Sequence, residues 1–112
     1  MEKSKNLGEF EILVLVALLR LKQEAYGAKV RQEIETRAHR RVSVGALYAT
    51  LSRLEDKGYV TSAVGAASAV RGGRAKRIYD LTDLGRERLE TALSGLTAML
   101  EGVSGWQNLP IR

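Results

Sequence analysis

The segment "VSVGALYATLSRLEDKGYV", residues 42–60, combines small and cationic side chains at helical spacing. At about 100° per residue, one face of such a helix carries Ala46, Ala49, Thr50, Arg53 and Lys57, with no large side chain at its start. Small alanines let a helix approach the base edges of a DNA groove closely. Threonine offers a donor, an acceptor and a methyl group, and arginine reaches a base or a phosphate. The face therefore predicts a DNA-reading helix; the alternative is a tolerant surface on an ordinary helix.

The elements that must position this helix follow from apolar periodicity and turn signals. Further helices are expected at 8–22, 26–38 and 83–101, and strand-like runs at 59–64 and 74–82 flank a connector rich in glycine. The order is helix, helix, helix, hairpin, helix. It predicts a mainly α chain with a small β-hairpin, a winged helix-turn-helix followed by a C-terminal helix.

Capping residues set the expected boundaries within this plan. The Ser43 hydroxyl can accept from an unpaired amide at the start of the third helix, and Thr82 can do the same for the last helix. Gly58 is expected to close the third helix in a left-handed conformation. We expect residues 1–82 to form the DNA-binding domain and residues 83–112 to form the dimerisation helix with a short tail.

Cations gather at the tip and on the returning strand of the predicted hairpin, with no acidic residue between them. They are Arg71, Arg74, Lys76 and Arg77. Such a cluster can contact phosphates or enter a minor groove without reading sequence. A solvated charge run is the alternative, and the cluster alone does not decide between the two.

The first helix has two apolar stripes, whereas a helix on the surface of a small domain needs only one. The second stripe predicts contact with another copy of the chain, and the last helix carries a leucine stripe of its own. The alternative is that both stripes are covered within one subunit. The predicted dimer residues are Ile12, Leu15, Val16, Leu19, Leu89, Leu93, Leu96 and Leu100.

Composition narrows the function classes. The 112-residue chain has a formal net charge of +5, which favours an anionic partner, and has no cysteine, which excludes disulfides and fits a reducing cytoplasm. Its N-terminus lacks an export signal, and no stretch is long enough to span a bilayer. His39 is the single histidine, and no catalytic set or metal-ligand spacing is visible. We therefore expect a cytoplasmic protein that is not an enzyme and has no metal or cofactor.

Four motifs resemble the PadR family of bacterial transcriptional regulators over roughly residues 7–90. The family typically shows G-x-x-E, a Tyr-Gly pair, G-x-L-Y-x-x-L-x-R-L-E-x-x-G, and a basic run followed by Tyr and L-T-x-x-G. The matching positions are Gly8, Glu11, Tyr26, Gly27, Gly45, Leu47, Tyr48, Leu51, Arg53, Leu54, Glu55, Gly58, Arg77, Tyr79, Leu81, Thr82 and Gly85. One departure is Ala49, where the family often has proline; alanine should make the helix more regular.

The resemblance implies a homodimeric repressor on double-stranded DNA, bound to an operator with two-fold symmetry, with the C-terminal helix packed against the partner's first helix. Tyr48 and Tyr79 would lie near the DNA boundary with their rings inward, and Glu55, on the inner face of its helix, would be a structural acceptor. The expected DNA-binding set is Tyr26, Lys29, Ser43, Ala46, Tyr48, Thr50, Arg53, Arg71, Arg74, Lys76 and Arg77.

The same resemblance implies a small aromatic effector at the dimer centre. Phe10, Val14, Met99 and Trp106 could line its pocket, since an indole can stack on a flat ligand. Core packing, or a tail that covers the dimer seam, is the alternative role for these residues. The competing function is a winged-helix module that binds mainly protein and has little specific affinity for DNA.

Overall fold

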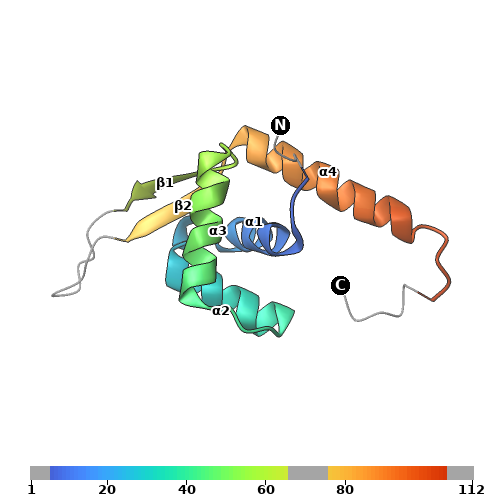
Figure 1. The fold of residues 1–112 in the computed structure, drawn as a ribbon, viewed down its shortest axis with the longest axis horizontal. Helices are drawn as coiled ribbons and strands as arrows, with labels where there is room; N and C mark the ends of the chain where they lie inside the picture. The colour runs from blue at the N-terminus through green and yellow to red at the C-terminus, as the bar shows by residue number, and fades with distance from the viewer. Residues whose placement is uncertain (1–5, 66–75, 106–112) are drawn as a thin grey trace.

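The computed structural model describes residues 6–65 and 76–105 and has the predicted order of elements (Figure 1). Three helices precede a two-stranded antiparallel hairpin, and a long helix follows it. A short 3-10 turn after the first helix is the one element that periodicity did not predict. The elements are α1 (Glu9–Leu21), η1 (Lys22–Glu24), α2 (Gly27–Ala38), α3 (Val44–Asp56), β1 (Val60–Val64), β2 (Arg77–Leu81) and α4 (Asp83–Leu100).

The predicted caps are confirmed. Ser43 Oγ accepts from the Ala46 amide at 3.0 Å at the start of α3, and Thr82 Oγ1 accepts from the Gly85 amide at 3.0 Å at the start of α4. Gly58 follows α3 with a φ of +80°, a left-handed conformation that glycine adopts without strain.

The core surrounds α1, which packs against α2, α3, α4 and β2. Two of the predicted dimer residues belong to this core. Leu15 is 0% exposed and Leu89 is 2% exposed within one chain, so their assignment to a dimer interface is wrong. At these two positions the alternative holds, because the side chains are covered within one subunit. Ile12, Val16 and Leu19 are only partly buried.

Strand β2 is hydrogen-bonded both to β1 and to the residues just before α2. β1 pairs with β2 from Val60↔Leu81 to Val64↔Arg77, and an isolated bridge joins β2 to Tyr26, just before α2. The Tyr79 amide also donates to the Ala25 carbonyl at 2.9 Å. The base of the wing therefore has a fixed position relative to α2.

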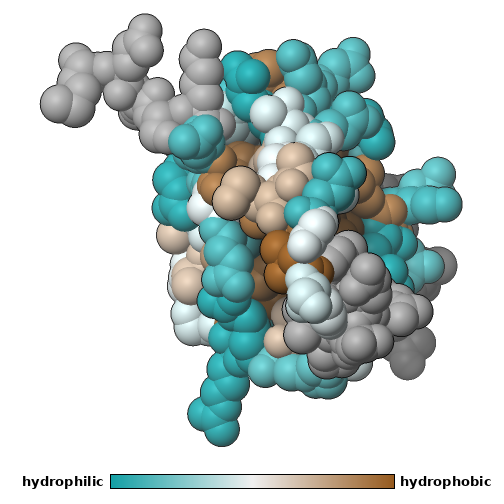
Figure 2. Space-filling model, turned by 90° about the vertical axis from the view of Figure 1, so that its right-hand side faces the viewer, coloured by the Kyte–Doolittle hydropathy of each residue, from teal (hydrophilic) through white to brown (hydrophobic). Residues whose placement is uncertain are grey.

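The last helix extends away from the body formed by the other elements (Figure 1). Large apolar side chains remain exposed along it: Leu84, Leu93, Leu96 and Met99, and beyond its end Val103. Figure 2 shows hydrophobic side chains gathered in the middle of the face at this end of the molecule, with hydrophilic ones around them. Among the described helices, none is long and apolar enough to cross a membrane.

Candidate nucleic-acid interface

The outer face of α3 differs in part from the predicted one. Leu47, Leu51 and Leu54 are buried, as periodicity predicts, and Ala46 and Ala49 are exposed. Val44, which has the helical spacing of these leucines, is nevertheless 52% exposed, and Tyr48, whose ring was expected to lie inward, is 45% exposed. The free face of α3 therefore begins with Val44, Ala46, Tyr48 and Ala49, and it offers both small groups and one phenol.

The prediction that Thr50 lies on the DNA-reading face is wrong. Thr50 is only 4% exposed. It stands three residues after Leu47 and four before Leu54, so it shares their side of the helix. Its hydroxyl oxygen accepts from Arg53 Nη2 at 3.3 Å instead of facing a groove.

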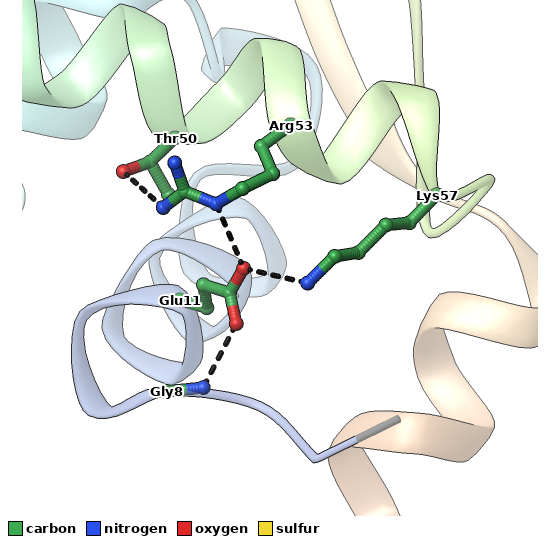
Figure 3. Close-up of polar contacts among 5 residues, drawn as sticks. All are labelled: Gly8, Glu11, Thr50, Arg53 and Lys57. Atoms are coloured by element: carbon green, nitrogen blue, oxygen red, sulfur yellow. Dashed lines mark hydrogen bonds and ion pairs between the residues drawn. The ribbon is translucent and has the colours of Figure 1, made fainter. Parts of the chain in front are cut away.

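Arg53 and Lys57 reach from α3 to a single carboxylate on α1 (Figure 3). Glu11 Oε2 accepts from Arg53 Nε at 3.3 Å and from Lys57 Nζ at 3.2 Å. Its other oxygen, Oε1, accepts from the Gly8 amide at 2.8 Å. Glu11 is 6% exposed, so an ionised group lies almost completely inside the fold. These charge-assisted bonds supply the partners that a buried carboxylate requires.

The electrostatics of Glu11 reflect two opposing effects. Burial disfavours its charge, but the hydrogen bond from the Gly8 amide and the bonds and charges of Lys57 and Arg53 outweigh burial. The net result is a pKa of Glu11 below the usual 4.5. The side chain is therefore ionised at neutral pH and ties α3 to the first turn of α1.

Tyr48 crosses from α3 to the start of α2. A Cβ atom at Gly27 would overlap the phenol of Tyr48, which explains why a residue without a side chain stands there.

Burial raises the pKa of the Tyr79 phenol above its usual 10.0, and Tyr48 and Glu55 raise it further. Tyr79 is 7% exposed, so of these two tyrosines only Tyr48 presents a substantial surface to solvent.

Glu55 is an acceptor, as expected, but it is exposed rather than on the inner face of α3. Its carboxylate accepts from Ser62 Oγ at 2.6 Å, and Ser62 Oγ accepts from Arg77 Nη1 at 3.0 Å. This chain of bonds joins α3 to both strands of the wing. Arg77 is therefore exposed and held in position at the same time.

The cations at the wing base lie beside α2. Lys76 Nζ is 4.0 Å from the centroid of the Tyr26 ring, close enough for a cation–π contact, while Lys29 pairs loosely with Glu24 at 3.9 Å. The Ser43 hydroxyl is exposed, but its oxygen already accepts the hydrogen bond from the Ala46 amide that caps α3. Arg71 and Arg74 lie outside the described residues. The structure thus brings the start of α2, the free face of α3 and the wing base to one surface.

Comparisons with known proteins agree with this arrangement. The profile of the "Transcriptional regulator PadR-like family" matches residues 14–91. Transcriptional regulator Rv3488 of Mycobacterium tuberculosis is 38% identical over 85 residues, which cover 76% of this chain and 75% of the relative. The chain belongs to the PadR-like family. It is therefore a transcriptional regulator of a DNA-binding family.

Solved structures support the fold of this PadR-like chain. A PadR family transcription regulator from Clostridium difficile R20291 is 26% identical, with a TM-score of 0.69 over 82% of this chain and 91% of that one. A PadR-like transcription factor from Bacteroides fragilis is 25% identical, with a TM-score of 0.63 over 82% and 84% of the two chains. Both likenesses confirm the winged helix-turn-helix assignment.

Of the effector residues predicted for this PadR-like regulator, Phe10, Val14 and Met99 belong to the described part of the chain. Val14 is 0% exposed, which makes its assignment to a ligand pocket wrong. Phe10 packs against the core beneath Arg40, whose guanidinium carbon is 5.6 Å from the ring centroid. Met99 lines a groove, described below, and Trp106 lies outside the described residues. Among the described residues, no cluster of three or more acidic or histidine side chains could hold a metal ion.

The contacts of Glu11 and Ser62 were not predicted from the sequence. Glu11 was named only as a position of a motif, and Ser62 was not named at all. Their contacts join residues 42, 46 and 15 positions apart, so no local spacing indicates them. The one available signal was a carboxylate within the apolar α1 segment, because such a group needs a cationic partner from elsewhere.

Proposed function

We propose that this PadR-like chain represses transcription as a homodimer bound to an operator with two-fold symmetry. In this proposal α3 of each protomer enters a major groove and the wing lies along the neighbouring backbone. The observation that carries it is the free face of α3, where the small side chains of Ala46 and Ala49 are exposed beside Tyr48. Arg53 is exposed further along the same helix. The wing-base cations Lys76 and Arg77 stand beside that face and supply phosphate contacts.

A second copy of the chain is the proposed cover for α4. Leu93, Leu96 and Met99 are 40%, 54% and 78% exposed, and apolar side chains in such a row favour burial against a partner. Leu96 and Met99 line a groove of about 640 Å³ between the first turn of α1 and α4, together with Leu7, Ile12 and other residues. Of the predicted dimer residues, this proposal keeps Ile12, Val16, Leu19, Leu93, Leu96 and Leu100.

The groove also supports a place for the predicted aromatic effector. Met99 is the one predicted ligand residue that lines it, and its other apolar walls come from Ile12, Ala92 and Leu96. Arg88 lies in the same groove with a buried Nε that has no hydrogen-bond partner among the described residues. A flat apolar compound in this groove would compete with the partner's α4. We propose that such competition releases the operator.

Selection of bound fragments from random duplex DNA tests the proposal directly. A dimeric reader returns an inverted repeat whose half-sites lie about one helical turn, or 34–36 Å, apart. Affinity should also fall steeply with salt, with about 0.9 units of log–log slope for each phosphate contact. Equal binding of a scrambled duplex at moderate salt would contradict the proposal and favour a module that binds protein through α4.

A further inference from the structure

Glu11 accepts from two cations, Arg53 of α3 and Lys57 at its end, and leaves part of the Arg53 guanidinium free. We propose that Glu11, with help from Thr50, is a positioning residue that sets the DNA selectivity of this regulator. It presents one edge of Arg53 to the bases and withholds Lys57 from phosphates. The inference rests on the proposed DNA-binding role of α3 and assigns sequence discrimination to a carboxylate that itself faces the core.

The hydrogen-bond pattern of Arg53 carries the first step. A guanidinium has five N–H donors in a rigid plane. Its Nε donor goes to Glu11 and one Nη2 donor goes to Thr50, at 3.3 Å each. Among the described residues, Nη1 has no partner, and the side chain is 52% exposed. The end of the fork therefore remains open, and this edge can donate to O6 and N7 of a guanine.

Lys57 carries the second step. Its side chain is 19% exposed, its ammonium lies 3.2 Å from Glu11 Oε2, and the ring centroid of Tyr59 is 6.0 Å away. A lysine freed at this end of α3 would be a mobile point charge able to meet a phosphate of any sequence. By pairing with it, Glu11 removes a contact that adds affinity without discrimination.

The rigidity of the carboxylate carries the third step. Glu11 Oε1 is fixed by the Gly8 amide at 2.8 Å, and the side chain is 8% exposed, so both oxygens are oriented by the first turn of α1. α1 is the helix around which the core packs. Glu11 thus fixes the orientation of the Arg53 guanidinium relative to the core. Because the Arg53 side chain is already ordered, it loses less conformational entropy when DNA binds.

The experiment compares Glu11→Gln with Glu33→Gln, a matched control on α2. Both variants remove one negative charge that two cations share, but Glu33 pairs with Arg20 at 2.6 Å and with Arg37 at 2.8 Å, and it lines neither the groove nor the free face of α3. The readout is the ratio of dissociation constants for a scrambled duplex and for the selected operator, measured over a salt series. Circular dichroism and light scattering establish that each variant is folded and has the mass of the wild type.

For Glu11→Gln we expect the selectivity ratio to fall by roughly 5- to 100-fold, the discrimination that a well-oriented arginine supplies. The salt slope on the scrambled duplex should steepen by about one unit, because Lys57 becomes available to a phosphate. For Glu33→Gln the ratio should stay within about twofold of the wild type, since its cationic partners are outside the proposed DNA-binding set and exposed pairs contribute little.

Thr50→Val supplies a second variant, because it keeps the buried shape and removes only the hydroxyl that accepts from Arg53. Its selectivity ratio should fall, by less than that of Glu11→Gln. A folded Glu11→Gln variant that keeps the wild-type ratio would overturn the inference. So would an unchanged ratio in Thr50→Val if the glutamine variant does not fold. A wild-type chain that binds both duplexes equally would overturn the proposed function itself, which is a distinct result.

Discussion

Three glycines stand in the first turns of three helices, and the structure predicts that an alanine at each has a different effect. Gly27 begins α2, Gly45 lies in the first turn of α3 and Gly85 lies in the first turn of α4. At Gly85 a Cβ atom would enter the space of the Tyr59 carbonyl, well within the 3.0 Å that real Cβ atoms respect. The backbone cannot swing away as a flexible side chain can.

The cost of Gly85→Ala follows from that contact. Overpacking against a fixed neighbour costs about 1–3 kcal/mol. The same Tyr59 carbonyl accepts from the Thr82 amide at 3.0 Å, and losing that bond costs about 1 kcal/mol more. We therefore expect a loss of about 2–4 kcal/mol, which lowers the midpoint of thermal unfolding by roughly 10–30 °C for a domain of this size.

Urea and thermal unfolding followed by circular dichroism measure the effect at one fixed protein concentration. Gly45→Ala is the control: nothing lies within 4 Å of its added Cβ, so stability should be unchanged or slightly higher. Gly27→Ala meets only the movable end of the Tyr48 ring, so it should cost less than Gly85→Ala while displacing that ring. A loss below about 1 kcal/mol for Gly85→Ala would refute the steric argument.

The remaining predictions concern assembly, acid stability and binding. Leu96→Asp should convert a dimer into a folded monomer by light scattering, whereas Leu15→Asp should unfold the chain because Leu15 is 0% exposed; a Leu96 variant of unchanged mass would exclude the α4 interface. Because the pKa of Glu11 is below 4.5 in the folded chain, its stabilisation is complete above pH 4.5 and lost as the pH falls through the folded value. Melting from pH 7 to 3 should therefore show a smaller acid dependence in Glu11→Gln, and identical pH profiles would contradict this. Arg53→Ala should relax sequence preference and Arg77→Ala should weaken all duplexes alike, as binding to mutated operators can measure.

Local chemistry was predictable from the sequence, and this explains why the element boundaries were found. The caps at Ser43 and Thr82 and the left-handed Gly58 depend on neighbours within three or four residues. Such caps can be predicted because the groups that form them are close together in the sequence. The hairpin was predicted for the same reason, because two strand-like runs lie on either side of a connector rich in glycine.

What covers an apolar stripe was not predictable. Periodicity marks Leu15 and Leu89 as apolar and Leu96 as equally apolar, but it does not say whether the cover comes from the same chain. Only the fold shows that the first two are buried within the subunit and the third is 54% exposed. The prediction for Thr50 failed for a different reason. Thr50 was assigned to the outward face, whereas its spacing from Leu47 and Leu54 places it on their buried side.

One short turn joins the two surfaces on which the proposed function depends. Leu7, Glu9 and Ile12 line the groove beside α4, and the residues between them, Gly8 and Glu11, hold the clamp on α3. Under the proposed function, a partner helix or compound in the groove would contact the turn that orients Glu11. Such a coupling would be reciprocal, so an operator that favours one arrangement of Arg53 would also favour one arrangement of the groove. In the proposed dimer, assembly and operator selection would then depend on the same turn of α1.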